Sequence, residues 1–314
     1  MTNAIIPQTQ TVIRISQPLA TALDVLLYSL SDSSKRQYEY TFKKWTSFCH
    51  ANGIAPHQMS AQHIIHFLEH DNLAHSSKQA RLSHIRKLLE TMHAQQPDNT
   101  ELESLYKQVK LLKVKRSESD KQADARPKHA LNAQQVHEMF RIFKGDTRQD
   151  ARNRCLLAIL LYCGLRRAEA SALKWSDIDL ETMLITVQHG KGDKERTIPI
   201  LGGRRYIETW QAMTLGRTFV FCGFRKGDKL REDKPIQPNA IYKIIKPLEM
   251  MLGIEGLSPH DARRTLITNL LNNGASVSDV QFIAGHANPQ TTLGYAVVKD
   301  AKEVLGRVAN KVGY

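Results

Sequence analysis

The sequence has few cysteines and no long apolar run, and both absences narrow the class of protein. Its 314 residues include four cysteines, whose spacing matches neither paired metal ligands nor the disulfide framework of a secreted domain. No stretch approaches the roughly 18 to 20 uncharged apolar residues of a membrane helix, and the polar N-terminus lacks a signal-peptide pattern. We therefore expect a cytoplasmic protein in which these cysteines are buried thiols: Cys49, Cys155, Cys163 and Cys222.

Internal repeats, low-complexity tracts and clustered carboxylates are absent as well. The lack of clustered carboxylates argues against a metal-dependent nuclease or phosphatase. His63, His66 and His70 share the spacing of one helix face, but no fourth ligand accompanies them, so we predict no metal site.

What the chain has in excess is positive charge, with 44 Lys and Arg against 31 Asp and Glu, a net charge of +13. Lysines and arginines that neutralise phosphates release condensed counterions, which favours binding to nucleic acid. A net charge also keeps a protein soluble, so charge alone leaves both explanations open.

The hydrophobic pattern divides the chain into two parts. Residues 1–16 are polar and are expected to be flexible, and residues 115–128 have almost no large apolar residue and are typical of a linker. Before the linker, helical periodicity predicts five helices, at 19–30, 34–51, 61–69, 78–94 and 102–114. After it, we expect further helices at 132–143, 152–162, 207–213, 239–252, 261–273, 277–284, 290–297 and 301–312. Two β-prone runs, 183–189 and 195–200, predict a hairpin around a Gly-rich turn.

The helix at 34–51 is expected to bury one face and leave a basic face exposed. Its apolar stripe consists of Tyr38, Phe42, Trp45, Phe48 and Cys49. Basic residues mostly off that stripe, together with those at the start of the linker, are the candidates for DNA contact: Lys35, Arg36, Lys43, Lys44, Lys113, Lys115 and Arg116. The alternative for each lysine is an ordinary solvated face.

Near the C-terminus, polar residues suited to phosphate chemistry gather at short spacing. They are His260, Arg263, His286 and Tyr295, and upstream Arg166 and Glu169 stand in a Gly-Leu-Arg-x-x-Glu motif. A tyrosine phenol with a pKa of ~10 costs ~4 kcal/mol to ionise at neutral pH, so a tyrosine that attacks phosphate needs help. Two guanidiniums supply it by stabilising the additional negative charge of the transition state. Arg167 and Arg264 are the adjacent alternatives.

These residues together resemble the active-site set of the tyrosine recombinases, the phage integrase family. The resemblance implies Tyr295 as nucleophile, Arg166, Arg263, His260 and His286 around the phosphate, and Glu169 in support of the first arginine. It also implies a lysine on the hairpin turn as the acid that protonates the leaving 5′-hydroxyl. Lys191 in Gly-Lys-Gly-x-Lys-x-Arg matches this position, with Lys194 as the alternative.

The chain departs from the family pattern at packing or peripheral positions. Ala284 stands where leucine is usual, Arg264 where many members carry histidine, and Ala296-Val297 where Thr-His is frequent. None of these differences removes a catalytic role, so the resemblance predicts an active enzyme.

The family's architecture is mainly α-helical. The resemblance implies an N-terminal helical core-binding (SAM-like) domain at 17–114, an α+β catalytic domain with a small antiparallel sheet at 129–298, and a C-terminal helix at 299–314 that docks in cis or in trans. The two domains would form a C-shaped clamp on double-stranded DNA.

The resemblance also implies a homotetramer on two DNA sites that works through a 3′-phosphotyrosyl intermediate and a Holliday junction, without metal, ATP or other cofactor. A cytoplasmic, nucleoid-associated location is expected. Whether the enzyme integrates a mobile element, excises, inverts or resolves DNA, and whether an accessory directionality factor takes part, is left open. The rival functions are a type IB topoisomerase and a DNA-binding protein with a vestigial site.

Overall fold

The computed structural model describes residues 13–14, 19–118, 120, 130–188, 195–286 and 288–295. These residues fall into two compact units, an N-terminal unit (1–126) and a C-terminal unit (127–314). The Gly-rich turn with Lys191 and Lys194, most of the expected linker and the C-terminal helix expected at 301–312 lie outside the described residues. No described helix is long and apolar enough to cross a membrane.

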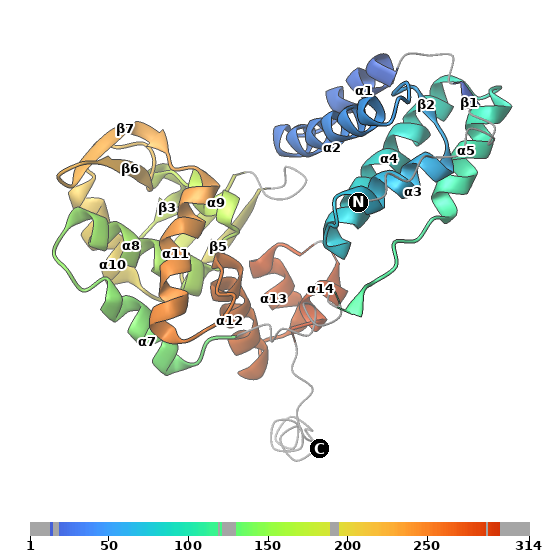
Figure 1. Ribbon diagram of the computed structural model, residues 1–314. Helices are drawn as coiled ribbons and strands as arrows, with labels where there is room; N and C mark the ends of the chain where they lie inside the picture. The colour runs from blue at the N-terminus through green and yellow to red at the C-terminus, as the bar shows by residue number, and fades with distance from the viewer. Residues whose placement is uncertain are drawn as a thin grey trace, which may run out of the picture. The chain divides into compact units, whose positions relative to one another are not determined.

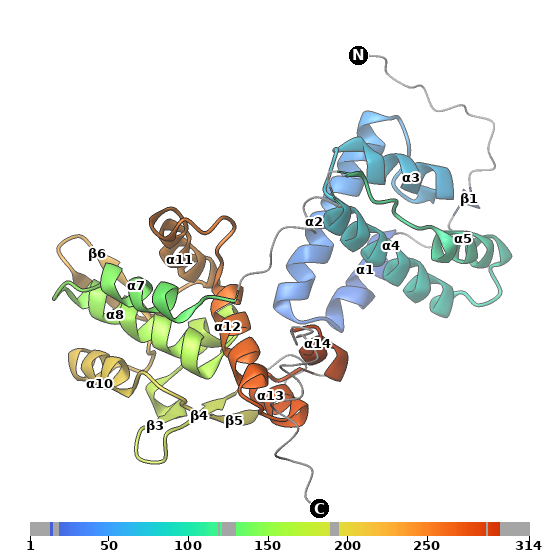
Figure 2. The same cartoon turned by 90° about the horizontal axis from the view of Figure 1, so that it is seen from below.

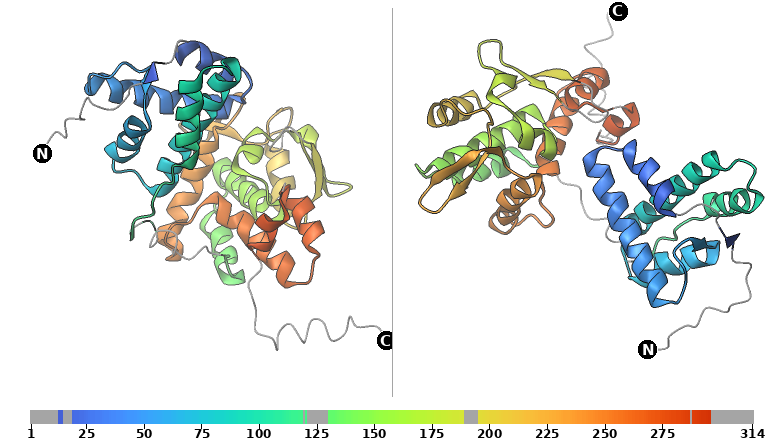
Figure 3. Two further views of the ribbon diagram at one scale, coloured as in Figure 1. Left: turned by 90° about the vertical axis from the view of Figure 1, so that its right-hand side faces the viewer. Right: turned by 90° about the horizontal axis from the view of Figure 1, so that it is seen from above.

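The N-terminal unit is helical, with one short strand pair (Figures 1 and 3). Its elements are α1 (Leu19–Tyr28), α2 (Asp32–Ala51), α3 (Ala61–His70), α4 (His75–Gln95) and α5 (Thr100–Leu111), with β1 (Ile13–Arg14) antiparallel to β2 (Gln58–Met59). All five helices predicted for this part are confirmed. The last one ends earlier than predicted because the Arg86 side chain donates to its terminal carbonyls at Val109 and Lys110. Lys113 therefore follows the helix instead of belonging to it.

Helix α2 is anchored by the apolar stripe that its sequence predicted. Phe42, Trp45 and Cys49 are buried, and the Trp45 indole nitrogen donates to the Pro56 carbonyl at 3.0 Å. The indole also meets the Phe67 ring of α3 edge to face, with ring centroids 5.3 Å apart. A fully buried tryptophan with these contacts ties α2 to α3 and to the loop that precedes α3.

The C-terminal unit carries most of the chain's sheet structure among its helices (Figure 2). Its helices are α7 (Ala133–Ile142), α8 (Arg148–Ala158), η1 (Ile159–Cys163), α9 (Arg167–Ala172), η2 (Trp175–Asp177), α10 (Arg204–Met213), α11 (Pro238–Leu252), α12 (Pro259–Asn272), α13 (Val277–Ala284) and α14 (Pro289–Leu293). Its strands are β3 (Ile178–Asp179), β4 (Leu184–Val187), β5 (Arg196–Pro199), β6 (Cys222–Arg225) and β7 (Lys229–Pro235). All four cysteines of the chain are buried free thiols, as predicted.

The predicted hairpin is present as β4 and β5, and β3 extends it to a three-stranded antiparallel sheet. Ile185 pairs with Ile198, and both side chains are fully buried. This register fixes which face of β5 points to the interior.

A second hairpin, β6–β7, was not among the elements predicted after residue 200, where helices were expected to dominate. Most residues of β7 are charged or exposed, so the strand lacks the apolar alternation that reveals a half-buried strand. Its turn contains Gly227 and Asp228, both with positive φ (75° and 56°), which suits a tight hairpin turn. The hairpin lies at the opposite end of the C-terminal unit from α13 and α14 (Figures 1 and 2).

Two helices near the candidate site differ from their predicted form. The helix predicted at 152–162 begins at Arg148 and becomes the π-helix η1 for its last turn, which ends at Gly164. The helix predicted at 290–297 ends at Leu293, so Tyr295 lies in the turn after α14 and not in a helix. Gly294 follows as the helix cap, with right-handed backbone.

Candidate active site

The first arginine of the site is positioned by the start of α9. Arg166 is the N-cap of this helix, and its backbone N–H donates to Glu169 Oε2 at 2.7 Å. Its guanidinium Nη1 donates to the other carboxylate oxygen, also at 2.7 Å. Backbone and side chain of Arg166 are thus held by one carboxylate, whose side chain is 3% exposed.

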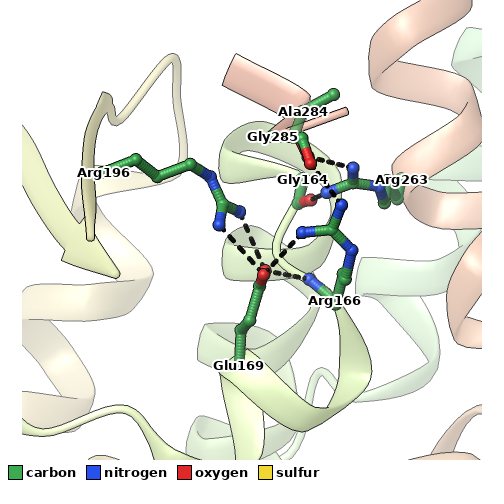
Figure 4. A network of polar contacts seen from close by, with 7 residues as sticks. All are labelled: Gly164, Arg166, Glu169, Arg196, Arg263, Ala284 and Gly285. Carbon is green, nitrogen blue, oxygen red and sulfur yellow. Dashed lines mark hydrogen bonds and ion pairs between the residues drawn. The ribbon is translucent and has the colours of Figure 1, made fainter. Parts of the chain in front are cut away.

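A further arginine approaches the same carboxylate from the sheet. Arg196, at the start of β5, donates from Nη1 and Nη2 to both oxygens of Glu169 at 2.9 Å (Figure 4). Burial on its own would raise the pKa of Glu169, but the hydrogen bonds from Arg196 and from the Arg166 backbone lower it to about 2. Glu169 is therefore ionised throughout the neutral range.

The second predicted arginine is held by the ends of two helices. Arg263 on α12 is 1% exposed, and it donates to the carbonyls of Gly164 at the end of η1 and Ala284 at the end of α13. Arg166 Nη2 donates to the next carbonyl, that of Gly285, at 2.5 Å (Figure 4). Carbonyls at helix C-termini have no partner within the helix and carry partial negative charge, so they suit guanidinium groups.

Two glycines make these carbonyls available. Gly164 and Gly285 both have left-handed backbone, with φ of 63° and 59°. A Cβ at Gly285 would lie 2.9 Å from Arg196 Nε, and one at Gly164 would lie 2.9 Å from Leu266 Cδ2. A side chain at either position would therefore strain the left-handed backbone and displace a neighbouring side chain, that of Arg196 beside Gly285 and that of Leu266 beside Gly164.

Tyr295 lies against two histidines. Its hydroxyl is 3.1 Å from Nε2 of His260 on α12. Its ring stacks on that of His286, with centroids 5.8 Å apart and planes at 17°. His286 Nδ1 is in turn 2.9 Å from the hydroxyl of Thr292, a fully buried residue of α14.

The surroundings of both histidines favour the neutral imidazole. Burial and the positive charges of Arg264 and Arg263 lower the pKa of His260. Burial, followed by the charges of Arg263 and Arg166, lowers the pKa of His286 to about 4. Burial lowers the pKa of Arg263 to about 10, which leaves its guanidinium charged at neutral pH. The site thus combines charged hydrogen-bond donors with neutral imidazoles beside a tyrosine hydroxyl.

Comparison with known families matches residues 129–302, more than half of the chain, to the phage integrase family. The chain belongs to this family. Tyrosine recombinase XerC of Bacillus licheniformis is 32% identical over 216 residues, which cover 65% of this chain and 66% of that protein. Tyrosine recombinase XerA of Pyrococcus furiosus is 29% identical over 195 residues, which cover 59% of this chain and 64% of that protein.

These alignments span about half to two thirds of the length of the curated relatives. Among solved structures, the Tn1549 transposon integrase in complex with circular intermediate DNA has a TM-score of 0.66 and 17% identity, covering 94% of this chain and all of that one. XerH site-specific recombinase bound to difH substrate has a TM-score of 0.64 and 20% identity, covering 95% of this chain and 85% of that one. These likenesses confirm the fold class predicted from the sequence: mainly helical, with a small antiparallel sheet in the integrase-type domain.

Within this phage integrase domain, the structure brings together most residues that the sequence selected. Arg166, Glu169, Arg263, His260, His286 and Tyr295 lie in one connected cluster of the C-terminal unit. Lys191 and Lys194 lie outside the described residues. Of the adjacent alternatives, Arg167 is exposed, whereas Arg264 packs over the Tyr295 ring.

The basic residues proposed for DNA contact belong to the N-terminal unit. Arg36, Lys43 and Lys44 are exposed on α2, and Lys35 is partly buried. Lys113, Lys115 and Arg116 are exposed after α5.

Three residues of the phage integrase site were not assigned a role from the sequence: Arg196, Arg264 and Thr292. Arg196 is the last residue of the Gly-Lys-Gly-x-Lys-x-Arg motif, so a signal for it was present. Thr292 gave no separate signal, because Thr291 and Thr292 stand together between Pro289 and Tyr295 and both suit a turn.

Proposed function

We propose that this chain is a site-specific recombinase that cleaves and rejoins double-stranded DNA through a 3′-phosphotyrosyl intermediate and a Holliday junction. The observation that carries the proposal is the Tyr295 hydroxyl 3.1 Å from His260 Nε2, in the same cluster as two arginines held by helix-end carbonyls. A nucleophile, a proton acceptor and two oxyanion-binding groups are the parts that phosphoryl transfer to a tyrosine requires.

In the proposed cleavage step, Arg166 and Arg263 bind the non-bridging oxygens of the scissile phosphate. The Tyr295 oxygen attacks phosphorus and its proton passes to His260 Nε2. The bond from phosphorus to the tyrosine oxygen forms while the bond to the 5′ oxygen breaks, and that oxygen leaves as a hydroxyl with a proton from Lys191, or from Lys194 as the alternative. Rejoining reverses these transfers when the 5′-hydroxyl of a partner strand attacks the phosphotyrosine.

His286 would act as a hydrogen-bond donor to the phosphate. When its Nδ1 accepts the Thr292 hydroxyl, its Nε2 carries the proton and can donate to an oxygen. Its stacking on the Tyr295 ring keeps the imidazole beside the nucleophile. Glu169 and Arg196 would act on Arg166 and not on the substrate, since the carboxylate holds both guanidiniums.

The DNA would be bound mainly through its phosphates. The proposed contacts come from α2 and from the segment after α5: Lys35, Arg36, Lys43, Lys44, Lys113, Lys115 and Arg116. Replacing Lys43 and Lys44 by Ala should weaken binding to all sequences alike and lower the salt slope by about two.

Assembly as a homotetramer on two DNA sites is part of the same proposal, with the core-binding domain at 17–114, the linker at 115–128 and the catalytic domain at 129–298. The helix expected at 299–314 would dock on a neighbouring protomer. Replacement of Val304, Leu305 and Val308 by Ser tests this docking: tetramer formation and strand exchange should be lost, and their survival would contradict it.

The first experiment is covalent capture with labelled DNA fragments from beside the chain's own gene. Wild type should give a protease-sensitive protein–DNA band on a denaturing gel, and Tyr295→Phe should not. Tyr28→Phe is the matched control, because it removes the same hydroxyl at a residue that is 90% exposed, and it should form the band.

Two other outcomes would each point to a rival. Supercoil relaxation without recombinant products would favour a type IB topoisomerase. Specific binding without any covalent band, even on nicked substrates that trap the intermediate, would favour a DNA-binding protein with a vestigial site.

A further inference from the structure

Arg264 directly follows Arg263, the arginine expected to bind phosphate, but its side chain contacts the proposed nucleophile Tyr295. Its guanidinium carbon lies 4.8 Å from the centroid of the Tyr295 ring. Its side chain is 15% exposed. A guanidinium packed on an aromatic face is attracted by the electron-rich ring and restrains how the ring turns.

The charge of Arg264 is only weakly compensated by its neighbours. Its nearest carboxylate is Asp261, with Nε to Oδ1 at 3.8 Å, beyond hydrogen-bond distance. The other oxygen of Asp261 accepts from the backbone and hydroxyl of Ser258 as part of the helix cap. Nε of Arg264 is buried and has no hydrogen-bond partner within the described part of the chain. By contrast, Arg166 and Arg263 are both tied to carbonyl or carboxylate oxygens.

The weakly compensated charge of Arg264 also acts on His260. After burial, Arg264 is the largest influence that lowers the pKa of His260, and Asp261 opposes it. His260 is also the second residue of α12, where the positive end of the helix disfavours an imidazolium. The charged and titratable groups that face it are Asp261, Arg263, Arg264, Arg166, His286 and Tyr295.

We propose that Arg264 is a positioning residue that clamps the Tyr295 ring and keeps His260 neutral, so that Nε2 can accept the phenolic proton. The inference rests on the proposed function, since it assigns a part in the same cleavage step. Arg264 acts through the tyrosine and the histidine and need not touch the DNA. The combination explains why a partly buried cation without a hydrogen-bonded carboxylate occupies this position.

The test is the pH dependence of covalent-complex formation on a nicked substrate that traps the intermediate. Removing the charge with Arg264→Gln should raise the pKa of His260 by about one unit, the lower end of the effect of a nearby charge. The acid limb of the pH–rate profile should shift to higher pH by the same amount. At pH values below that limb, the rate of covalent-complex formation should fall about tenfold. Arg264→Lys keeps the charge and should retain the wild-type acid limb.

Arg141→Gln is the matched control for the loss of one charge. Arg141 is exposed on α7 and pairs with Glu138, so its replacement should leave the profile unchanged. Equal slowing of Arg264→Gln at every pH, or slowing that matches a loss of DNA affinity, would overturn the inference and leave Arg264 as a packing or DNA-contacting residue.

A second measurement separates this inference from the proposed function. NMR titration of histidine-labelled protein, with the His260 signal assigned through His260→Asn, gives the histidine pKa without any DNA. A higher pKa for His260 in Arg264→Gln than in wild type supports the inference, and an unchanged pKa refutes it. Absence of covalent complex from wild type would instead refute the proposed function.

Discussion

Glu169→Gln exchanges one carboxylate oxygen for an amide nitrogen at the point where two arginines meet. Arg166 and Arg196 both donate to this side chain, which is 3% exposed. The amide cannot accept from both guanidiniums, and its own N–H groups would face their N–H groups. Two partly buried cations, Arg166 and Arg196, would then lose their shared anion.

The size of the effect follows from the pKa of Glu169. A fall from the ordinary 4.5 to about 2 corresponds to about 3 to 4 kcal/mol of folding free energy, at roughly 1.4 kcal/mol per pKa unit. This agrees with the roughly 3 to 5 kcal/mol lost when one partner of a buried ion pair is removed. Because the folded-state pKa is depressed, the contribution is complete above about pH 4.5 and is lost as the pH falls toward about 2.

Urea unfolding of the full chain, with hydrogen exchange and mass spectrometry to assign each loss to a unit, measures this energy. Glu169→Gln should destabilise the C-terminal unit by about 3 to 4 kcal/mol at pH 7 and leave the N-terminal unit unchanged. The control is Glu138→Gln, which removes a carboxylate that is 38% exposed, and it should cost under about 0.5 kcal/mol. Equal costs for the two variants, or a difference that grows as the pH falls below 4, would refute the reasoning.

Three further predictions concern backbone, orientation and core. Gly285→Ala should lower the free energy of unfolding by about 1 to 2 kcal/mol because its backbone is left-handed, and it should also slow cleavage by displacing Arg196. The control is Gly253→Ala, at a helix cap with φ of 64° and no atom within 4 Å of the added Cβ. In the same denaturation and cleavage assays it should lose stability without slowing cleavage. Thr292→Val should slow covalent-complex formation about fivefold, because one hydrogen bond of about 1 kcal/mol no longer orients His286; an unchanged rate would contradict this. Trp45→Ala should cost about 3 to 5 kcal/mol in the N-terminal unit only, measured by hydrogen exchange.

Where helices have one apolar face, the sequence predicted them closely. The helix at 277–284 has the predicted bounds, because Ser276 caps its start and Gly285 ends it. The sequence did not reveal the π-helix of Ile159–Cys163. Almost every residue of that segment is apolar and buried, so the spacing of apolar residues cannot distinguish a π-helix from an α-helix. It did not reveal β7 either, because that strand buries almost nothing.

In the candidate site, too, local spacing could be predicted from the sequence and contacts between distant segments could not. His260 and Arg263 could be placed together because one helical turn separates them on α12. The partnership of Arg196 with Glu169 could not, because 27 positions separate the two residues and only the packing of β5 near α9 makes them neighbours. The contact of Arg264 with Tyr295 could not be predicted either, because it depends on how the turn after α14 places the tyrosine against α12.

The helix-end carbonyls that hold Arg166 and Arg263 orient these groups without cancelling their charge. Within the described residues, the cluster therefore keeps a surplus of cations over its carboxylates, Glu169 and Asp261. Such a surplus accepts any tetrahedral oxyanion of suitable size. Sulfate and phosphate buffers should raise the melting temperature of the purified protein and compete with DNA. Chloride or acetate salts are accordingly the better choice for binding and cleavage measurements.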